Sequence, residues 1–289
     1  MKNGLTISMI FEAQSANYGE GFGNIATLKK LSRSDGKTYT YISRQALRYN
    51  MINQLGWDNT PVFDNGVVQF APNATIRDYP EIDLFGYMKT EAKGSGAGTQ
   101  TRSAVARLSN AISLEPYNSD MDFLNNMGMA RRQGLNNAIA QSEIHHSLYA
   151  YTITVDLDRI GEDGDISLDS AEKEKRVENL LDTIQFLYRD IKGRRENLNP
   201  IFVIGGVYDR KNPYFEDRLK IDRDGLQVKM IEDIRNSCDD TLNNTVIGYV
   251  PQSLSNNEQI MDELHPLTVP EAFQAIKKEV KTYYESDQN

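Results

Sequence analysis

The chain passes from an extended segment into a helix within TYTYISRQALR, residues 38–48. Thr38–Ile42 contains only β-branched and aromatic residues, which favour a strand. Ser43 can cap a following helix, in which an apolar residue recurs at every fourth position up to Leu55. Gly56 is a suitable stop for that helix. The sequence therefore predicts a strand that runs directly into a helix.

Segments on either side of this junction predict a mixed fold. Residues 5–11 and 148–157 alternate apolar and polar positions, as half-buried strands do, and residues 201–208 form an apolar run typical of a buried strand. Between the last two, residues 171–192 have a helical apolar stripe that Gly193 can end. The order strand–helix–strand, insertion, strand–helix–strand indicates an α+β fold of the ferredoxin-like or RNA-recognition-motif type.

Regular periodicity is lost in the middle of the chain. A short strand is predicted at residues 67–70, and from there to Leu148 the sequence includes a glycine-rich stretch at 94–99 and an Asn/Met-rich stretch at 117–146. A helix is predicted at 270–284, with a capping box from Thr268 to Glu271. We find no internal repeat or linker, and predict a single domain over residues 1–289 with long insertions.

Composition indicates a cytoplasmic protein with an uneven charge. The 289 residues are 39% hydrophobic and 25% charged, with a single cysteine and no run of membrane-spanning length. The formal charge of −9 disfavours a nucleic-acid partner when it is taken over the whole chain. However, residues 1–155 carry 14 basic and 13 acidic residues, and the rest carry 18 and 28. Residues 29–50 hold six basic residues and one acid, Asp35, so local contact with a polyanion is possible.

Catalytic motifs are mostly incomplete. Gly19–Gly23 resembles a kinase glycine-rich loop, but no histidine precedes Arg-Asp, and both glycine-rich stretches lack a P-loop ending. The acidic cluster at 156–165 lacks two ligands of a calcium loop and is better explained as a solvated turn. The adjacent His145 and His146 have no evident third metal ligand. We therefore expect no metal, no cofactor and no catalytic residue.

Five elements, in order, resemble the backbone subunits of CRISPR-associated Cascade complexes, closest to the Cst/DevR branch of type I-B systems. Each is weak alone, and together they cover about the first 160 residues. They are the loop 14–17, the strand-to-helix signature 41–48 (roughly Ser-x-Gln-x-x-Lys/Arg), the Asp-x-x-Phe-Gly element 83–86, the stretch 106–116, and the strand at 147–151.

This resemblance implies a modified RNA-recognition-motif domain that polymerises along a guide crRNA and presents its bases to target DNA. The implied partners are crRNA, further copies of the chain, and the repeat-handle-binding, large and small Cascade subunits, with no membrane partner. Residues 117–146 would be a thumb that displaces a nucleotide at regular intervals. Ordinary packing, or contact with the next subunit, is an equal alternative role for its Met and Phe residues.

The residues expected to contact RNA are polar or cationic and lie in or near these elements. Sequence-independent binding uses phosphate and 2′-hydroxyl groups, which arginine and amide side chains and a helix N-terminus can bind. A helix cap is the alternative role for Ser43, and a surface ion pair is the alternative for Arg48. The predicted set is Asn17, Arg33, Ser43, Arg44, Gln45, Arg48, Arg102, Arg107, Arg131 and Arg132.

Two other functions are possible. Related type III backbone subunits cleave target RNA with a loop aspartate, for which Asp35 is the candidate, although Ser34-Asp35-Gly36 also suits a turn. A regulatory role is the third hypothesis, because the family name refers to developmental control. We rank it last because no segment resembles a helix-turn-helix.

Overall fold

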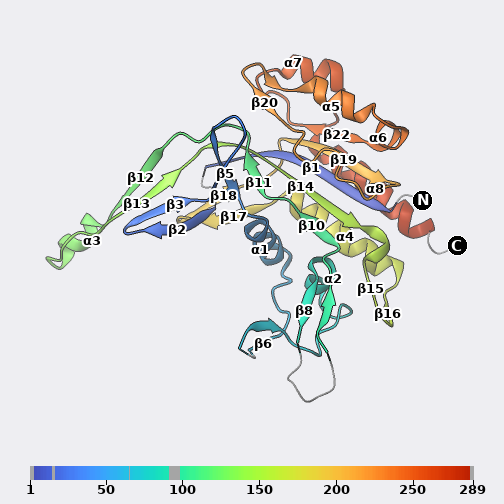
Figure 1. Cartoon of the computed structure of the whole chain (residues 1–289), viewed down its shortest axis with the longest axis horizontal. Helices are drawn as coiled ribbons and strands as arrows, with labels where there is room; N and C mark the ends of the chain where they lie inside the picture. Colours follow the sequence, from blue (N-terminus) through green and yellow to red (C-terminus); the bar gives the residue numbers. More distant parts are fainter. Residues whose placement is uncertain (1–2, 15–16, 65, 91–97, 287–289) are drawn as a thin grey trace.

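One antiparallel sheet forms the centre of the molecule (Figure 1). The computed structural model describes residues 3–14, 17–64, 66–90 and 98–286. The strands of the sheet lie in the order β22 (Val246–Tyr249), β19 (Phe202–Tyr208), β1 (Gly4–Ala13), β14 (Ser147–Asp156), β11 (Ala111–Ser113), β5 (Thr38–Ile42) and β4 (Lys30–Ser32), and β10 (Ala106–Leu108) also pairs with β14.

The predicted α+β class is confirmed. Along the chain the main elements follow one another as β1, α1 (Arg44–Leu55), β11, β14, α4 (Ser170–Gln185) and β19. In space the strands stand in the order β19–β1–β14–β11, with β1 antiparallel to both of its neighbours. The strand predicted at residues 67–70 lies outside this sheet.

Three helices cover one face of the sheet: α1, α4 and α8 (Val269–Ser286). Leu47 of α1, Val177 of α4 and Phe273 of α8 lie in one buried cluster with Leu5 and Ile7 of β1. Burial of these side chains fixes which face of each helix points outward, so the exposed face of α1 is determined by its packing.

The opposite face of the sheet is covered by the C-terminal segment that joins β19 to α8. Ile10 and Phe202 of the sheet pack there against Phe215, Ile231 and Ile260. This layer, at the top of Figure 1, contains β20 (Ile221–Asp222), β21 (Gly225–Leu226), α5 (Val228–Arg235), α6 (Asp239–Asn244), α7 (Asn257–Gln259) and a π-helical turn (Ile260–Leu264).

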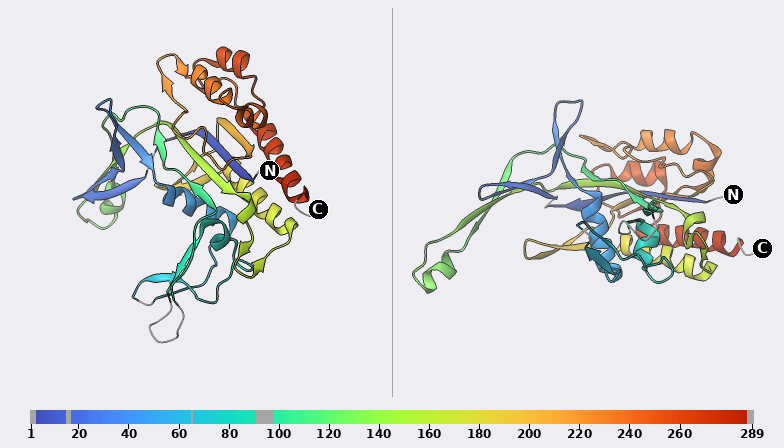
Figure 2. Two further views of the ribbon diagram at one scale, coloured as in Figure 1. Left: turned by 45° about the vertical axis from the view of Figure 1, so that its right-hand side comes forward. Right: turned by 60° about the horizontal axis from the view of Figure 1, so that its bottom comes forward.

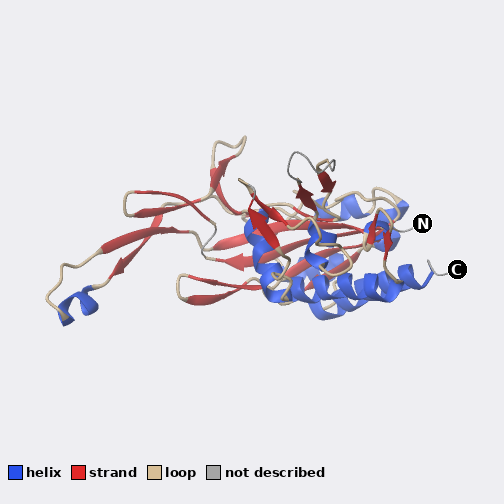
Figure 3. Ribbon diagram, turned by 90° about the horizontal axis from the view of Figure 1, so that it is seen from below, coloured by secondary structure: helices blue, strands red, loops and turns tan. Residues whose placement is uncertain are grey.

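A long hairpin projects away from the body of the molecule (Figures 2 and 3). It consists of β12 (Asp120–Asn125), the short helix α3 (Met127–Arg132) at its tip, and β13 (Ile139–Ile144). At its base β13 pairs with β3 (Ile25–Leu28), which pairs in turn with β2 (Tyr18–Phe22). The hairpin falls within residues 117–146.

Small elements lie below the sheet in Figure 1. They include α2 (Pro80–Phe85) and three pairs of short strands: β6 (Val62–Asp64) with β7 (Val68–Phe70), β8 (Tyr87–Lys89) with β9 (Gln100–Arg102), and β15 (Glu162–Asp163) with β16 (Ile166–Ser167), the last preceded by a 3₁₀ turn (Leu157–Arg159). The glycine-rich stretch 94–99 lies mostly outside the described residues, as do Ser15 and Ala16.

Two predicted helices are confirmed and a third is wrong in its length. Helix α1 begins after Ser43 and ends at Gly56 in the left-handed conformation, and α8 has the predicted Thr268–Glu271 capping box. Helix α4, however, ends at Gln185 rather than Lys192. Residues 188–197 instead form a hairpin, β17 (Tyr188–Ile191) with β18 (Arg194–Asn197).

Candidate nucleic-acid interface

Helix α1 positions the predicted cationic side chains. The Ser43 hydroxyl accepts a hydrogen bond from the backbone N–H of Ala46 at 3.3 Å, which caps the helix. Because Leu47 and Met51 face the core, Arg44, one turn from Arg48, projects from the outer side of α1. The orientation of this basic side follows from apolar burial on the other side.

A hollow of about 380 Å³ lies beside α1 and brings together residues from three elements. We call it the α1 hollow. Its cationic and amide members are Arg44, Gln45 and Arg48 of α1 and Arg107 of β10. Its remaining lining is Phe85 at the end of α2, with Ala104, Ala106 and Leu108. Four of the ten predicted RNA-contacting residues therefore share one concave surface.

Arg48 lies partly buried in this hollow. Its guanidinium is 5.0 Å from the centroid of the Phe85 ring, and its Nη2 is 3.6 Å from Glu81 Oε1. Burial lowers the pKa of the Arg48 guanidinium, and Glu81 opposes that shift. The group nevertheless stays protonated at any physiological pH. The Phe85 ring thus supports the positively charged Arg48 guanidinium from one side. The Arg48 side chain remains 33% exposed, so a ligand can reach it.

Arg107 reaches the hollow from the sheet and is held by a carboxylate. Its two terminal nitrogens donate to the two oxygens of Asp156 at 3.0 and 2.9 Å. Burial alone would raise the pKa of the Asp156 carboxyl, but Arg107, together with Lys211 and Arg159, keeps that pKa below its usual value. The Arg107 side chain is still 44% exposed, so it can offer its outer edge to a phosphate.

A buried ionic cluster fixes the floor of the hollow, and the sequence analysis did not foresee it. The Asp83 carboxylate accepts hydrogen bonds from Arg102 at 2.6 Å, from Arg176 at 2.8 Å and from the Gly161 backbone N–H at 3.0 Å. Asp83 is fully buried and precedes Phe85 on α2, so this cluster sets the position of the Phe85 ring. The stretch Asp83–Gly86 was the available signal, but the buried partners of Asp83 are distant in sequence.

The prediction that Arg102 contacts RNA is wrong. Only 3% of its side chain is exposed, and its nitrogens donate to Asp83 and to the backbone carbonyls of Arg159 and Glu162. A guanidinium committed in this way has no donor to offer a ligand without breaking a buried network.

Ser43 has its alternative role, that of a helix cap, and Asn17 contacts it. The Ser43 hydroxyl donates to Asn17 Oδ1 at 2.5 Å, and the Ser43 backbone N–H donates to the same oxygen at 3.2 Å. The backbone N–H of Arg44 donates to Asn110 Oδ1 at 2.9 Å. Backbone N–H groups at the start of α1 therefore already donate to side-chain oxygens of the protein. Ser43 and Asn17 position α1, and these N–H groups are not available to the anion predicted there.

Arg33 is not brought into the α1 hollow. It lies on the β4–β5 hairpin, with its guanidinium 4.9 Å from the centroid of the Tyr39 ring. It lines a narrow cavity with Ser8 and Phe215, which belong to the side of the sheet covered by the C-terminal segment. The nearby Asp35 accepts hydrogen bonds from the Lys37 N–H and the Tyr39 hydroxyl, which lowers the pKa of the Asp35 carboxyl.

Arg131 and Arg132 lie at the tip of the projecting hairpin, on α3, and both are exposed. Large apolar side chains are exposed around them: Phe123 is 63% exposed and Met129 65%. Apolar side chains of this size are rarely left in water on an isolated surface. The tip therefore has the composition of a surface that contacts another molecule.

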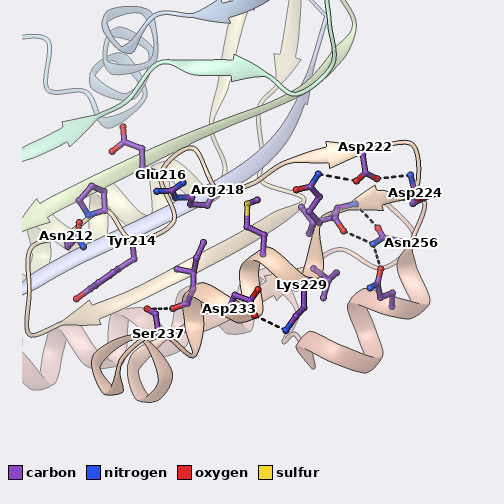
Figure 4. Close-up of a pocket in the computed structure, with 17 residues that line it drawn as sticks. Asn212, Tyr214, Glu216, Arg218, Asp222, Asp224, Lys229, Asp233, Ser237 and Asn256 are labelled. Atoms are coloured by element: carbon purple, nitrogen blue, oxygen red, sulfur yellow. Dashed lines mark hydrogen bonds and ion pairs between the residues drawn. The ribbon is translucent and has the colours of Figure 1, made fainter. Parts of the chain in front are cut away.

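Another cleft lies in the C-terminal layer and has a different character (Figure 4). Its volume is about 850 Å³. Its polar side chains pair largely with one another, as Lys229 does with Asp233 at 2.8 Å and Gln227 with Asp222 at 3.1 Å. No group of three or more metal-ligating side chains occurs among the described residues, and none of the helices described there is long and apolar enough to cross a membrane.

Comparison with solved structures gives the class of the fold. One chain, titled "CRISPR RNA-guided surveillance complex", superposes with a TM-score of 0.57 at 15% identity, covering 98% of this chain and 99% of that one. Another, titled "CRISPR RNA-guided surveillance complex, pre-nicking", gives 0.58 at 12% identity, covering 86% and 93%. The architecture is thus shared with components of such complexes.

Comparison of the sequence with family models defines the family. Residues 5–222 match the model described as CRISPR-associated negative auto-regulator DevR/Csa2. The chain belongs to this family, as the resemblance predicted. A search of curated proteins gave no match.

Proposed function

We propose that this chain is a non-catalytic backbone subunit of a type I-B Cascade effector, which binds the sugar–phosphate backbone of a guide crRNA independently of sequence. The observation that supports this most directly is the α1 hollow, where Arg44, Gln45, Arg48 and Arg107 line one surface. Guanidinium and amide groups suit phosphate and 2′-hydroxyl groups, which every guide shares.

The negative total charge is compatible with this role because the cations are locally concentrated. Screening limits each charge to a range of ~8 Å at physiological salt, so a strand in the hollow is insulated from the acidic C-terminal layer. That layer lies against the other side of the sheet from α1. We expect it to face solvent or a neighbouring protein.

The projecting hairpin of residues 117–146 supports the rest of the proposal. Arg131 and Arg132 at its tip, together with its exposed apolar side chains, suit contact with RNA and with a neighbouring copy of the chain. In this assembly, successive copies follow the crRNA, the bases between thumbs pair with target DNA, and other Cascade subunits bind the ends and sides. Arg33, on the other side of the sheet, is a weaker candidate contact.

The test is the double variant Gln45→Ala/Arg48→Ala, with Lys229→Ala as control. Lys229 is 78% exposed on α5, so the control removes a surface cation away from the hollow. We expect the double variant to lose small RNA that co-purifies with the wild type and with the control, measured as the 260/280 absorbance ratio after size exclusion. Retention of RNA by the correctly folded double variant would contradict the assignment of the hollow.

The alternative function is guide-dependent cleavage of target RNA, with Asp35 as the catalytic acid. Its two oxygens already stabilise the turn between β4 and β5, which favours a structural role. Incubation of target RNA and magnesium with the assembled protein distinguishes the two functions. Cleavage that disappears in Asp35→Ala would replace the non-catalytic proposal.

A further inference from the structure

The β17–β18 hairpin has an excess of exposed basic side chains, although it lies in the acidic part of the chain. Lys192, Arg194 and Arg195 are exposed on it, whereas Asp190 is its one exposed acid. From residue 156 onward the chain carries 18 basic and 28 acidic residues, so this local excess of cations runs against its surroundings. The sequence analysis placed residues 188–192 of this segment at the end of a helix and did not consider the segment as a site.

The geometry of the hairpin turns these cations outward. Lys192 and Gly193 form the turn with φ of 51° and 74°, which brings Ile191 opposite Arg194. On the inner side, Arg189 Nη2 is 2.6 Å from Glu196 Oε2, and both side chains are buried. The buried pair anchors the base of the hairpin, and the remaining cations are left on its outer surface.

Side-chain contacts place this hairpin beside α1, the helix whose first half lines the α1 hollow. The side-chain amide of Gln54, near the end of α1, donates to the Phe186 carbonyl at 2.9 Å and accepts from the Tyr188 N–H at 3.3 Å. At the hairpin tip, Lys192 Nζ is 4.4 Å from the centroid of the Tyr18 ring. Tyr18 follows Asn17, which binds the N-cap of α1. Figure 1 likewise draws β17 and β18 next to β2 and α1.

The cations of the hairpin keep an exposed side that a ligand can reach. Arg195 pairs with Asp190, but both side chains are 65% exposed, and pairs of this kind contribute little free energy. Arg194 donates to the buried Glu196 carboxylate at 2.6 Å and remains 44% exposed. A phosphate can therefore compete for Arg195 at small cost and can bind the outer edge of Arg194 while its bond to Glu196 is kept.

We propose that the β17–β18 hairpin is a second phosphate-binding surface, through which Lys192 and Arg194 hold the single-stranded RNA that occupies the α1 hollow. This inference rests on the proposed function, since it extends the path of the same strand. The Tyr18 ring beneath Lys192 keeps the ammonium group at the surface, as a cation–π contact can.

The experiment compares Lys192→Asn/Arg194→Gln with the control Lys229→Gln/Lys281→Gln. Asparagine tolerates the left-handed backbone at position 192. The control also removes two positive charges, from side chains that are 78% and 56% exposed on other elements. Binding of a mixed-sequence single-stranded RNA is measured against salt concentration, and the thermal melt checks folding.

We expect the hairpin variant to bind several-fold more weakly, with a salt slope smaller by about 1.4, since each phosphate contact on a single strand contributes ~0.7. The control should keep the wild-type slope. The charge-conserving variant Lys192→Arg/Arg194→Lys should also keep it.

Equal salt slopes for the hairpin variant and the control would overturn the inference. A salt slope reduced as much in the charge-conserving variant as in the hairpin variant would also overturn it. The proposed function fails separately. If Gln45→Ala/Arg48→Ala also leaves RNA binding unchanged, the α1 hollow is not an RNA site. If that variant loses RNA binding while the hairpin variant keeps it, only the hairpin assignment is wrong.

Discussion

Replacement of Asp83 by alanine tests whether the buried ionic cluster holds the binding surface together. Asp83 is the shared carboxylate of Arg102 and Arg176, and both guanidiniums are 3% exposed. Removing it takes away the carboxylate that the two buried cations share, leaving Arg176 with Glu172 at 2.8 Å and Arg102 with Asp163 at 3.8 Å, and it removes an acceptor of the Gly161 N–H. The perturbation is therefore larger than the loss of one ordinary surface pair.

The expected cost follows from this burial. Removal of one partner of a buried ion pair destabilises a protein by about 3–5 kcal/mol. For a chain of this size, 1 kcal/mol corresponds to about 2–4 °C in melting temperature, so the melt should fall by roughly 6–20 °C. Asp83→Asn keeps the shape and some hydrogen bonds, and we expect an intermediate loss.

The control is Asp233→Ala, which removes an acid from an exposed pair whose side chains are 78% and 62% exposed. Such a pair contributes about 1 kcal/mol or less, so its melt should stay within a few degrees of the wild type. Thermal and urea melts measure both variants. If Asp83→Ala has the same melting temperature as Asp233→Ala, the cluster does not stabilise the fold and cannot be the support of Phe85.

Three further outcomes are expected. Removing residues 124–140 closes the projecting hairpin at the Phe123–Gln141 pair, and it should leave RNA bound but abolish periodic nuclease protection; an unchanged footprint would argue against a thumb. His145 is buried with its Nδ1 2.8 Å from Thr40 Oγ1, and burial lowers its pKa, so the folded state resists protonation. Its contribution to stability is therefore complete above the unfolded pKa of about 6.5 and is lost as pH falls below it; His145→Gln should flatten the fall in melting temperature between neutral and acidic pH, and an unaltered pH profile would exclude His145 as its source. Gly86 has φ of +75°, and an added Cβ would lie 2.4 Å from the Arg102 carbonyl oxygen, so Gly86→Ala should cost at least about 1–3 kcal/mol in a urea melt, whereas a wild-type midpoint would contradict this strain.

The sequence predicted those parts of the site that depend on neighbours along the chain. The cap at Ser43, the stop at Gly56 and the shared side of Arg44 and Arg48 all lie within α1, so propensity and periodicity were enough. The same reasoning failed for residues 188–191. A helical stripe continued through them, but in the structure they pair as a strand with Arg194–Asn197, a partner that a helical pattern within one segment does not reveal.

The sequence by itself determined the α+β class, the main helix and the concentration of cations around it, because these depend on local patterns that survive without long-range contacts. Only the tertiary structure decided which cations share a surface. Arg102 and Arg107 lie close in sequence, yet the first is buried against Asp83 and the second opens into the α1 hollow. The cause is physical: the fate of a charged side chain depends on desolvation and on partners that the fold brings from distant positions.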